Sequence, residues 1–98
     1  MPRKITPEQA RSAYAVLVRE AGAPDDEWDA VGFVHHVAEA EHPTQEYRIC
    51  RALGFGGKFR NNGNHGGVPY VDCYPEDMTP EREAIIARTN AALAAIFQ

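Results

Sequence analysis

The stretch EYRICRALGFGGKFRNNGNHGGVPYVDCY, residues 46–74, decides the fold because it contains three short runs of alternating side chains. Alternation with aromatic and β-branched residues is typical of β-strands. The runs cover residues 46–53, 57–60 and 68–74, and a polar loop with an Asn-Gly turn signal, residues 61–67, joins the last two. The stretch therefore predicts an antiparallel sheet.

Alternation also divides the side chains between the two faces of this sheet. The first strand places on one face Tyr47, Ile49 and Arg51, and on the other Arg48, Cys50 and Ala52. The last strand places on one face Val71 and Cys73, and on the other Tyr70, Asp72 and Tyr74. Pro69 cannot donate a hydrogen bond to a neighbouring strand, so the last strand begins at an edge or at an unpaired position.

A helix is predicted on each side of the strands. Thr6 followed by a proline, with Gln9 three residues later, is a capping box that starts a helix over residues 7–21, and Gly22 ends it. Thr79 and its proline repeat the device for a helix over residues 80–97. The apolar stripes at helical spacing are Ala10, Ala13, Tyr14, Leu17, Val18 and Ala21 in the first helix, and Ile85, Ile86, Thr89, Ala92, Leu93, Ile96 and Phe97 in the last.

Residues 25–42, DDEWDAVGFVHHVAEAEH, fit two patterns. The residues at helical spacing are Trp28, Val31, His35 and Ala38, whereas those that alternate as in a strand are Val31, Phe33, His35 and Val37. The acidic start and the Ala-Glu repeat at the end favour a helix, but Gly32 and the valines favour a strand. The glycine and the valines are given the greater weight, so residues 31–38 are predicted to form a further strand.

The expected fold is α+β: a single two-layer domain, residues 1–98, with the order helix, antiparallel sheet of three or four strands, helix, and with both helices on one sheet face. A chain of 98 residues is long enough for one core of this kind. The other sheet face is then open to solvent or to a partner, which makes it the first place to look for function.

Composition places the protein among globular chains, with 44% hydrophobic and 24% charged residues. No apolar run approaches the roughly 20 residues of a transmembrane helix. The basic N-terminus is not followed by the apolar stretch of a secretory signal. We therefore expect a cytosolic protein that contacts no membrane.

Charge is distributed unevenly along the chain. Residues 46–67 carry +3 within a chain of net charge −4, because they contain a single acid, Glu46, and four bases, Arg48, Arg51, Lys58 and Arg60. Such a basic segment could meet a phosphate or an acidic partner, or it could form a solvated strand face that nearby acids balance.

The glycine-rich part of this segment lacks the signatures of phosphate-binding loops. Gly57 and Lys58 are followed by Phe59 and a strand, where a Walker loop needs a hydroxyl residue and a helix. The dinucleotide pattern also fails, because position 59 is not a glycine. A turn or bulge is expected instead, with an anion-binding nest of backbone N–H groups as the alternative.

The histidines and cysteines show no spacing typical of metal ligands. His35 and His36, as neighbours on a strand, would point to opposite faces. Cys50 and Cys73 are expected to be buried thiols, with a disulfide or a metal pair as alternatives. Cys73 with His35 is the only cysteine–base pair the sequence offers, and nothing brings the two together. No cofactor, metal site or catalytic residue is predicted.

Two resemblances bear on function. The order of elements resembles that of double-stranded-RNA-binding domains, which carry a lysine cluster at the start of the last helix, where this chain has TPEREAII. The segments EYRICRALGFGGKF (46–59) and YVDCYPEDMTPEREAIIARTNAAL (70–93) resemble a pattern in small proteins of bacterial phages and plasmids. The second resemblance implies stoichiometric binding to a host macromolecule, as by anti-CRISPR or anti-restriction inhibitors.

The predicted function is therefore non-enzymatic binding that inhibits or modulates a host protein or protein–nucleic-acid complex. A nucleotide or nucleic-acid binding module that uses the basic segment is the alternative, and a homodimer through an edge strand is a further option. The expected contact residues lie on the sheet and in the loops 54–67; they are Tyr47, Arg48, Arg51, Phe55, Lys58, Arg60, His65, Tyr70 and Tyr74. Because alternation keeps them from sharing one face, some must belong to the core.

Overall fold

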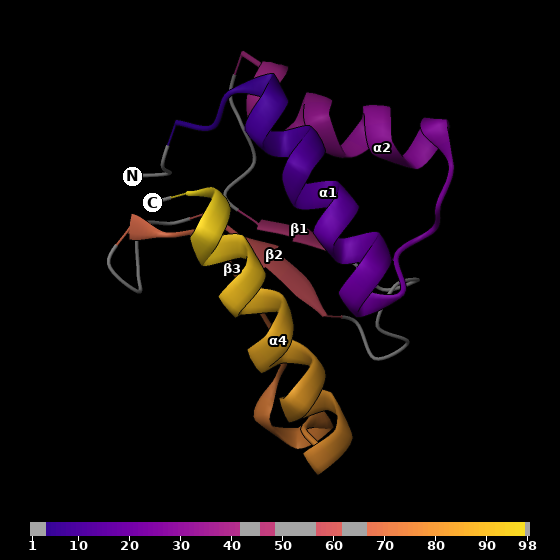
Figure 1. Ribbon diagram of the computed structural model, residues 1–98, viewed down its shortest axis with the longest axis vertical. Coiled ribbons are helices and arrows are strands. Elements are labelled where there is room, and N and C mark those ends of the chain that lie inside the picture. Colours follow the sequence, from indigo (N-terminus) through magenta and orange to yellow (C-terminus); the bar gives the residue numbers. More distant parts are fainter. Residues whose placement is uncertain (1–3, 42–45, 49–56, 62–66, 98) are drawn as a thin grey trace.

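The computed structural model places a three-stranded sheet behind a layer of helices (Figure 1). It describes residues 4–41, 46–48, 57–61 and 67–97. In this part of the chain the helical elements are α1 (Pro7–Ala21), α2 (Glu27–Val34), the π-helix η1 (His35–Glu39), the short 3₁₀ helix η3 (Pro75–Asp77) and α4 (Pro80–Ile96). The strands are β1 (Glu46–Arg48), β2 (Lys58–Arg60) and β3 (Tyr70–Asp72). The predicted α+β class is confirmed.

The sheet is antiparallel in the order β1-β2-β3. Tyr47 lies opposite Phe59, which lies opposite Val71, and this row faces the helices, with Phe59 and Val71 buried. On the other face lie those alternating side chains that the structure describes, as the sequence predicted for Tyr70 and Asp72. The predicted extension of the first strand to residue 53 lies outside the described residues.

Side-chain caps and backbone conformation account for the ends of helices α1 and α4. The capping box of α1 is complete, since Gln9 N donates to Thr6 Oγ1 at 3.1 Å and Thr6 N donates to Gln9 Oε1 at 3.0 Å. Gly22 ends the helix with φ of 74°, a left-handed conformation that favours glycine. The predicted bounds of α1 are therefore confirmed, and α4 ends one residue earlier than predicted.

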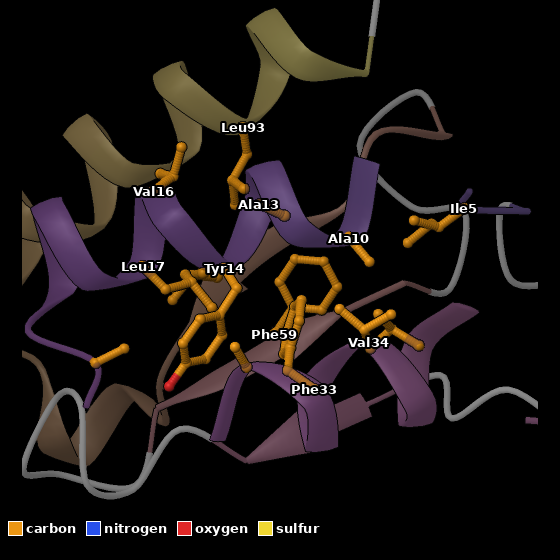
Figure 2. Close-up of a cluster of buried hydrophobic side chains, with 14 of the residues drawn as sticks. Ile5, Ala10, Ala13, Tyr14, Val16, Leu17, Phe33, Val34, Phe59 and Leu93 are labelled. Atoms are coloured by element: carbon orange, nitrogen blue, oxygen red, sulfur yellow. The ribbon is translucent and has the colours of Figure 1, made fainter. Parts of the chain in front are cut away.

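Helix α1 lies between α2 and α4 and carries the middle of the core (Figure 1). Figure 2 shows Tyr14 of α1 beside Phe33 from α2 and Phe59 from β2, and both phenylalanines are fully buried. Leu93 of α4 closes the cluster from the other side of α1 (Figure 2). All the long helices thus pack on one face of the sheet, which confirms the predicted layering.

The predicted strand over residues 31–38 is wrong, because this segment is helical through α2 and η1. The apolar side chains that enter the core from it recur at helical spacing: Ala30, Phe33, Val34 and Val37. Asp26 caps the start of α2 by accepting a hydrogen bond from Asp29 N at 2.8 Å. At the end the helix widens, and Ala40 N donates to His35 O at 2.8 Å, five residues back.

A side-chain amide joins α4 to the outer edge of the sheet. Asn90 Oδ1 accepts a hydrogen bond from Val71 N at 2.6 Å, and Asn90 Nδ2 donates to Val71 O at 3.0 Å. Asn90 therefore satisfies both backbone groups that β3 presents on the side away from β2. An edge strand covered in this way is protected at Val71 from pairing with a second chain.

We expect replacement of Asn90 by leucine to destabilise the protein by about 1–3 kcal/mol, because the backbone groups of buried Val71 lose their partners. The free energy of unfolding in urea measures this effect. Ala91→Leu, at an exposed position of the same helix, is the control and should change stability by no more than about 0.5 kcal/mol. Equal stability of Asn90→Leu and the parent protein would contradict this account.

Candidate functional site

The outer face of the sheet carries a network of charged side chains, which we call the charged sheet face; it comprises Glu46, Lys58, Arg60, Tyr70, Asp72 and Tyr74. Glu46 contacts both central cations, with Oε1 at 2.8 Å from Lys58 Nζ and Oε2 at 2.7 Å from an Arg60 guanidinium nitrogen. Arg60 Nε also donates to both oxygens of Asp72, at 2.8 and 2.9 Å. The two central bases of the sheet are therefore paired within it.

Lys58 is the most enclosed member of this face, with 7% of its surface exposed. Its ammonium group donates to Tyr74 Oη at 2.7 Å and lies 4.6 Å from the centre of the Tyr74 ring. Such a lysine is held by an acid, a hydroxyl and an aromatic ring, so it offers little charge to an incoming phosphate. For Lys58 and Arg60 the structure favours a strand face balanced by acids over a free basic patch.

These contacts shift the ionisation of the groups that make them. The hydrogen bond from Lys58, followed by the positive charges of Lys58 and Arg60, lowers the pKa of Glu46, although partial burial opposes the shift. In return, the Glu46 carboxylate is the main cause of a raised pKa at Lys58, and Asp72 is the main cause at Arg60. All three groups thus hold their charged forms more firmly than they would in water.

A second surface feature lies between α2 and β1, and the sequence did not predict it. It is a groove of about 360 Å³, which we call the Trp28 groove, lined by Trp28, Asp29, Val31, Gly32, His35, His36 and Tyr47. Trp28 is 85% exposed and Val31 is 49% exposed, although both are large apolar residues. Both residues line the same groove and give it exposed apolar surface, which is a feature of interaction sites.

The wall of the groove formed by β1 is anchored in the core. The ring of Tyr47 lies 5.3 Å from that of Phe33, edge to face, and 5.6 Å from that of His36. His36 in turn lies 5.6 Å from His35 at the start of the π-helix. Burial, and secondarily the negative charge of Asp29, raises the pKa of Tyr47. The groove thus has a fixed aromatic wall with a carboxylate close to it.

Gly32 forms an open part of the groove. A Cβ atom built at this position meets nothing within 4 Å, so no neighbouring group requires a glycine there. Glycine inside a helix costs about 1 kcal/mol relative to alanine. Gly32 therefore lowers the stability of α2. It also leaves open space beside Trp28 on the surface of this helix.

The structure places the predicted contact residues on two different surfaces. Lys58, Arg60, Tyr70 and Tyr74 lie on the charged sheet face. Tyr47 lies on the helix side and lines the Trp28 groove. Arg51, Phe55 and His65 lie outside the described residues, as does the side chain of Arg48. The sequence signal for the groove was a single tryptophan within the acidic run DDEWD, residues 25–29.

Metal binding and thiol reactivity have little support in the described residues. Within them, no group of three or more histidine, cysteine or acidic side chains is placed to hold a metal ion. Burial raises the pKa of Cys73, whose sulfur lies 4.0 Å from that of Met78, and a raised pKa disfavours the reactive thiolate. Cys50 lies outside the described residues. No helix in the described ranges is both long and apolar enough to cross a membrane.

Comparison with known proteins leaves the site to be judged on its own geometry. No protein-family model, no curated protein and no solved structure matches the chain.

The charge network makes stability depend on pH. The pKa of Glu46 is lower in the folded protein than in the unfolded chain, so its contribution is present above the ordinary pKa of a glutamate and is lost as pH falls through the lowered value. We expect Glu46→Gln to reduce the urea midpoint most near neutral pH, with the gap to the parent protein closing as the pH falls through the lowered pKa of Glu46. Glu76→Gln, at an exposed site, is the control. A gap that does not vary with pH would contradict the pairing.

The open space at Gly32 predicts a stabilising substitution. Gly32→Ala adds a methyl group that meets nothing and improves helix propensity, so unfolding should cost about 0.8–1 kcal/mol more. For a domain of this size the melting temperature should rise by about 4–8 °C, which a thermal scan followed by circular dichroism measures. Destabilisation by Gly32→Ala would show that the groove is closed at this position.

Proposed function

We propose that the protein is a non-enzymatic binding protein that captures a macromolecular partner at the Trp28 groove and acts by stoichiometric occupancy. The observation that carries this proposal is the 85% exposure of Trp28 beside the exposed Val31 and the open groove at Gly32. Tryptophan and tyrosine are enriched among the residues that dominate binding energy at protein interfaces. Trp28 and Tyr47 both line the groove.

The scaffold beneath the groove suits this role. Trp28 and Val31 project from a helix whose opposite side, through Phe33 and Val34, is buried in the core. Tyr47 stands on a strand that is paired in the sheet. Contact residues held on a helix and a strand lose little conformational freedom when a partner binds, which favours affinity.

The charged sheet face is a weaker candidate for the binding surface. Its two central cations already contact Glu46 and Asp72, so a nucleic acid would have to compete with these acids for them. The exposed edge of Tyr74, at 43%, remains available at the margin of that face. We therefore favour a protein partner over a nucleic acid, and the Trp28 groove over the sheet.

The resemblance to small proteins of phages and plasmids supports a host macromolecule as the partner, for example a CRISPR or restriction component. An inhibitor of this kind needs no catalytic group, because occupying a surface of its target is sufficient. An acidic chain of 98 residues with an exposed aromatic groove is suited to such blocking.

A pull-down from a lysate of the cells in which the protein acts tests the proposal. We expect Trp28→Ala to reduce partner capture about tenfold or more, with no change in the melting temperature. Tyr74→Ala, which removes an exposed aromatic residue from the charged sheet face, is the matched control and should leave capture intact. Nuclease treatment should also have no effect.

Two results would contradict the proposal. If Tyr74→Ala abolishes capture and Trp28→Ala does not, the partner docks on the sheet. If nuclease releases the captured material and capture falls steeply with added salt, the protein binds nucleic acid.

A further inference from the structure

The Trp28 groove differs from two other hollows in the described part of the chain by its number of aromatic rings. The rings in its lining belong to Trp28, His35, His36 and Tyr47. The hollow beside the start of α2, about 330 Å³, has one ring in its lining, that of Tyr14. The hollow between β3 and α4, about 220 Å³, also has one, that of Tyr70. Of the three, the Trp28 groove is the one suited to a ligand that stacks on rings.

Fixed charge contributes little to what the groove selects. None of its seven lining residues is a lysine or an arginine, so no fixed positive charge draws an acidic segment to it. Asp29, the one acid in the lining, is engaged in an interaction within the protein. The indole N–H of Trp28 and the hydroxyl of Tyr47 are donors to a neutral acceptor. The lining therefore suits an uncharged, apolar segment that offers carbonyl oxygens.

The size of the groove suits a short segment better than a folded surface. A stable interface between folded proteins, including two copies of one chain, takes about 20–30 residues from each side. The groove has seven lining residues and a volume of about 360 Å³. A few residues of an extended chain fill such a space, so the occupant we consider is a short segment of the partner.

The spacing of the rings along the helix matches the repeat of a polyproline II segment. Trp28 and His35 share a helix face seven residues apart, which at about 1.5 Å per residue is about 10 Å along the axis. Polyproline II rises about 3.1 Å per residue with three residues per turn, so prolines three residues apart share a face about 9 Å apart. Gly32 lies between the two rings, and a Cβ atom there would meet nothing within 4 Å.

We propose that the Trp28 groove binds a proline-rich segment of the partner protein in the polyproline II conformation, with prolines three residues apart stacked on Trp28 and His35. This inference rests on the proposed function, because it names the chemistry of the partner at the same groove. Proline-rich segments bind aromatic-lined grooves because their conformation is preformed, so little conformational freedom is lost. Their carbonyl oxygens make no internal hydrogen bonds and are acceptors for the indole N–H of Trp28.

A titration with uncharged peptides tests the inference. Trp28 is the only tryptophan in the chain, so its fluorescence reports on the groove. The probe is a capped decaproline peptide. The control is a capped peptide of Gly-Ser repeats of the same length, which lacks the pyrrolidine rings and the preformed conformation. We expect decaproline to change the fluorescence of Trp28 and the Gly-Ser peptide to leave it unchanged. Because decaproline carries no charge, its affinity should not fall with added salt.

Two further peptides of identical composition test the spacing. In capped Pro-Ser-Ser-Pro-Ser-Ser-Pro the prolines recur every three residues, whereas in capped Pro-Ser-Pro-Ser-Pro-Ser-Ser no two prolines are three residues apart. The first peptide should bind about threefold more tightly or better, because two of its prolines meet Trp28 and His35 at once.

Filling the groove tests where the peptide binds. Gly32→Leu places a side chain in the open space and improves helix propensity, so it should abolish decaproline binding without lowering the melting temperature. Ala91→Leu, which adds the same side chain at an exposed position of α4, is the matched control and should leave binding unchanged. Trp28→Leu keeps an apolar side chain but removes the ring, and should weaken binding about tenfold in calorimetry.

Four peptide results would overturn the inference: no binding of decaproline, equally tight binding of the Gly-Ser peptide, equal affinities for the two spaced peptides, or normal decaproline binding by Gly32→Leu. Sedimentation of the free protein tests a second copy as the occupant. A dimer that Gly32→Leu dissociates would show that another copy fills the groove, and would also overturn the inference.

The proposed function is judged separately by partner capture. If decaproline does not bind while Trp28→Ala loses the partner, the groove docks its partner through other chemistry, and the inference alone is wrong. If decaproline binds as expected while Trp28→Ala keeps the partner, the groove binds proline-rich segments, and the main docking surface of the proposed function lies elsewhere.

Discussion

The ring of Phe33 is the contact on which the rest of the structure depends. It lies 5.3 Å from the ring of Tyr14, 5.3 Å from that of Tyr47 and 5.0 Å from that of Phe59, so it joins α2 to α1, β1 and β2. Each such aromatic pair contributes about 0.5–1.5 kcal/mol beyond the burial of its surface. Helices α1 and α2 and two of the strands therefore meet at one side chain in the middle of the core (Figure 2).

The inward position of Phe33 also decides what α2 shows to solvent. In a helix, residues five before and two before a buried position lie on the opposite side of the axis. Burial of Phe33 therefore turns Trp28 and Val31 away from the core. The same ring holds Tyr47, which forms the opposite wall of the groove. The fold and the candidate site thus both depend on the packing of Phe33. Trp28 is exposed because α2 packs with Phe33 towards the core.

The sequence predicted those features that rest on local chemistry. The proline-led caps at Thr6 and Thr79 located α1 and α4, and alternation located the strands and the outward side of Tyr70 and Asp72. Helix α2 was missed because it is apolar on two sides, which gives overlapping patterns that resemble a strand. The helical pattern considered in the sequence ran through Trp28, Val31, His35 and Ala38, whereas the buried stripe contains Phe33 and Val34. The pairing of Glu46 with Lys58 was also hidden, since it depends on the register between two strands.

That pairing explains why the basic segment of the sequence and the candidate site are different places. A slip of one residue in β2 would turn Lys58 and Arg60 towards the helices and Phe59 towards solvent, so the ion pairs with Glu46 and Asp72 help to fix the register. Cations used in this way contribute to the arrangement of the sheet and have little attraction left for a partner. The candidate site lies instead on α2, where Trp28 and Val31 expose apolar surface.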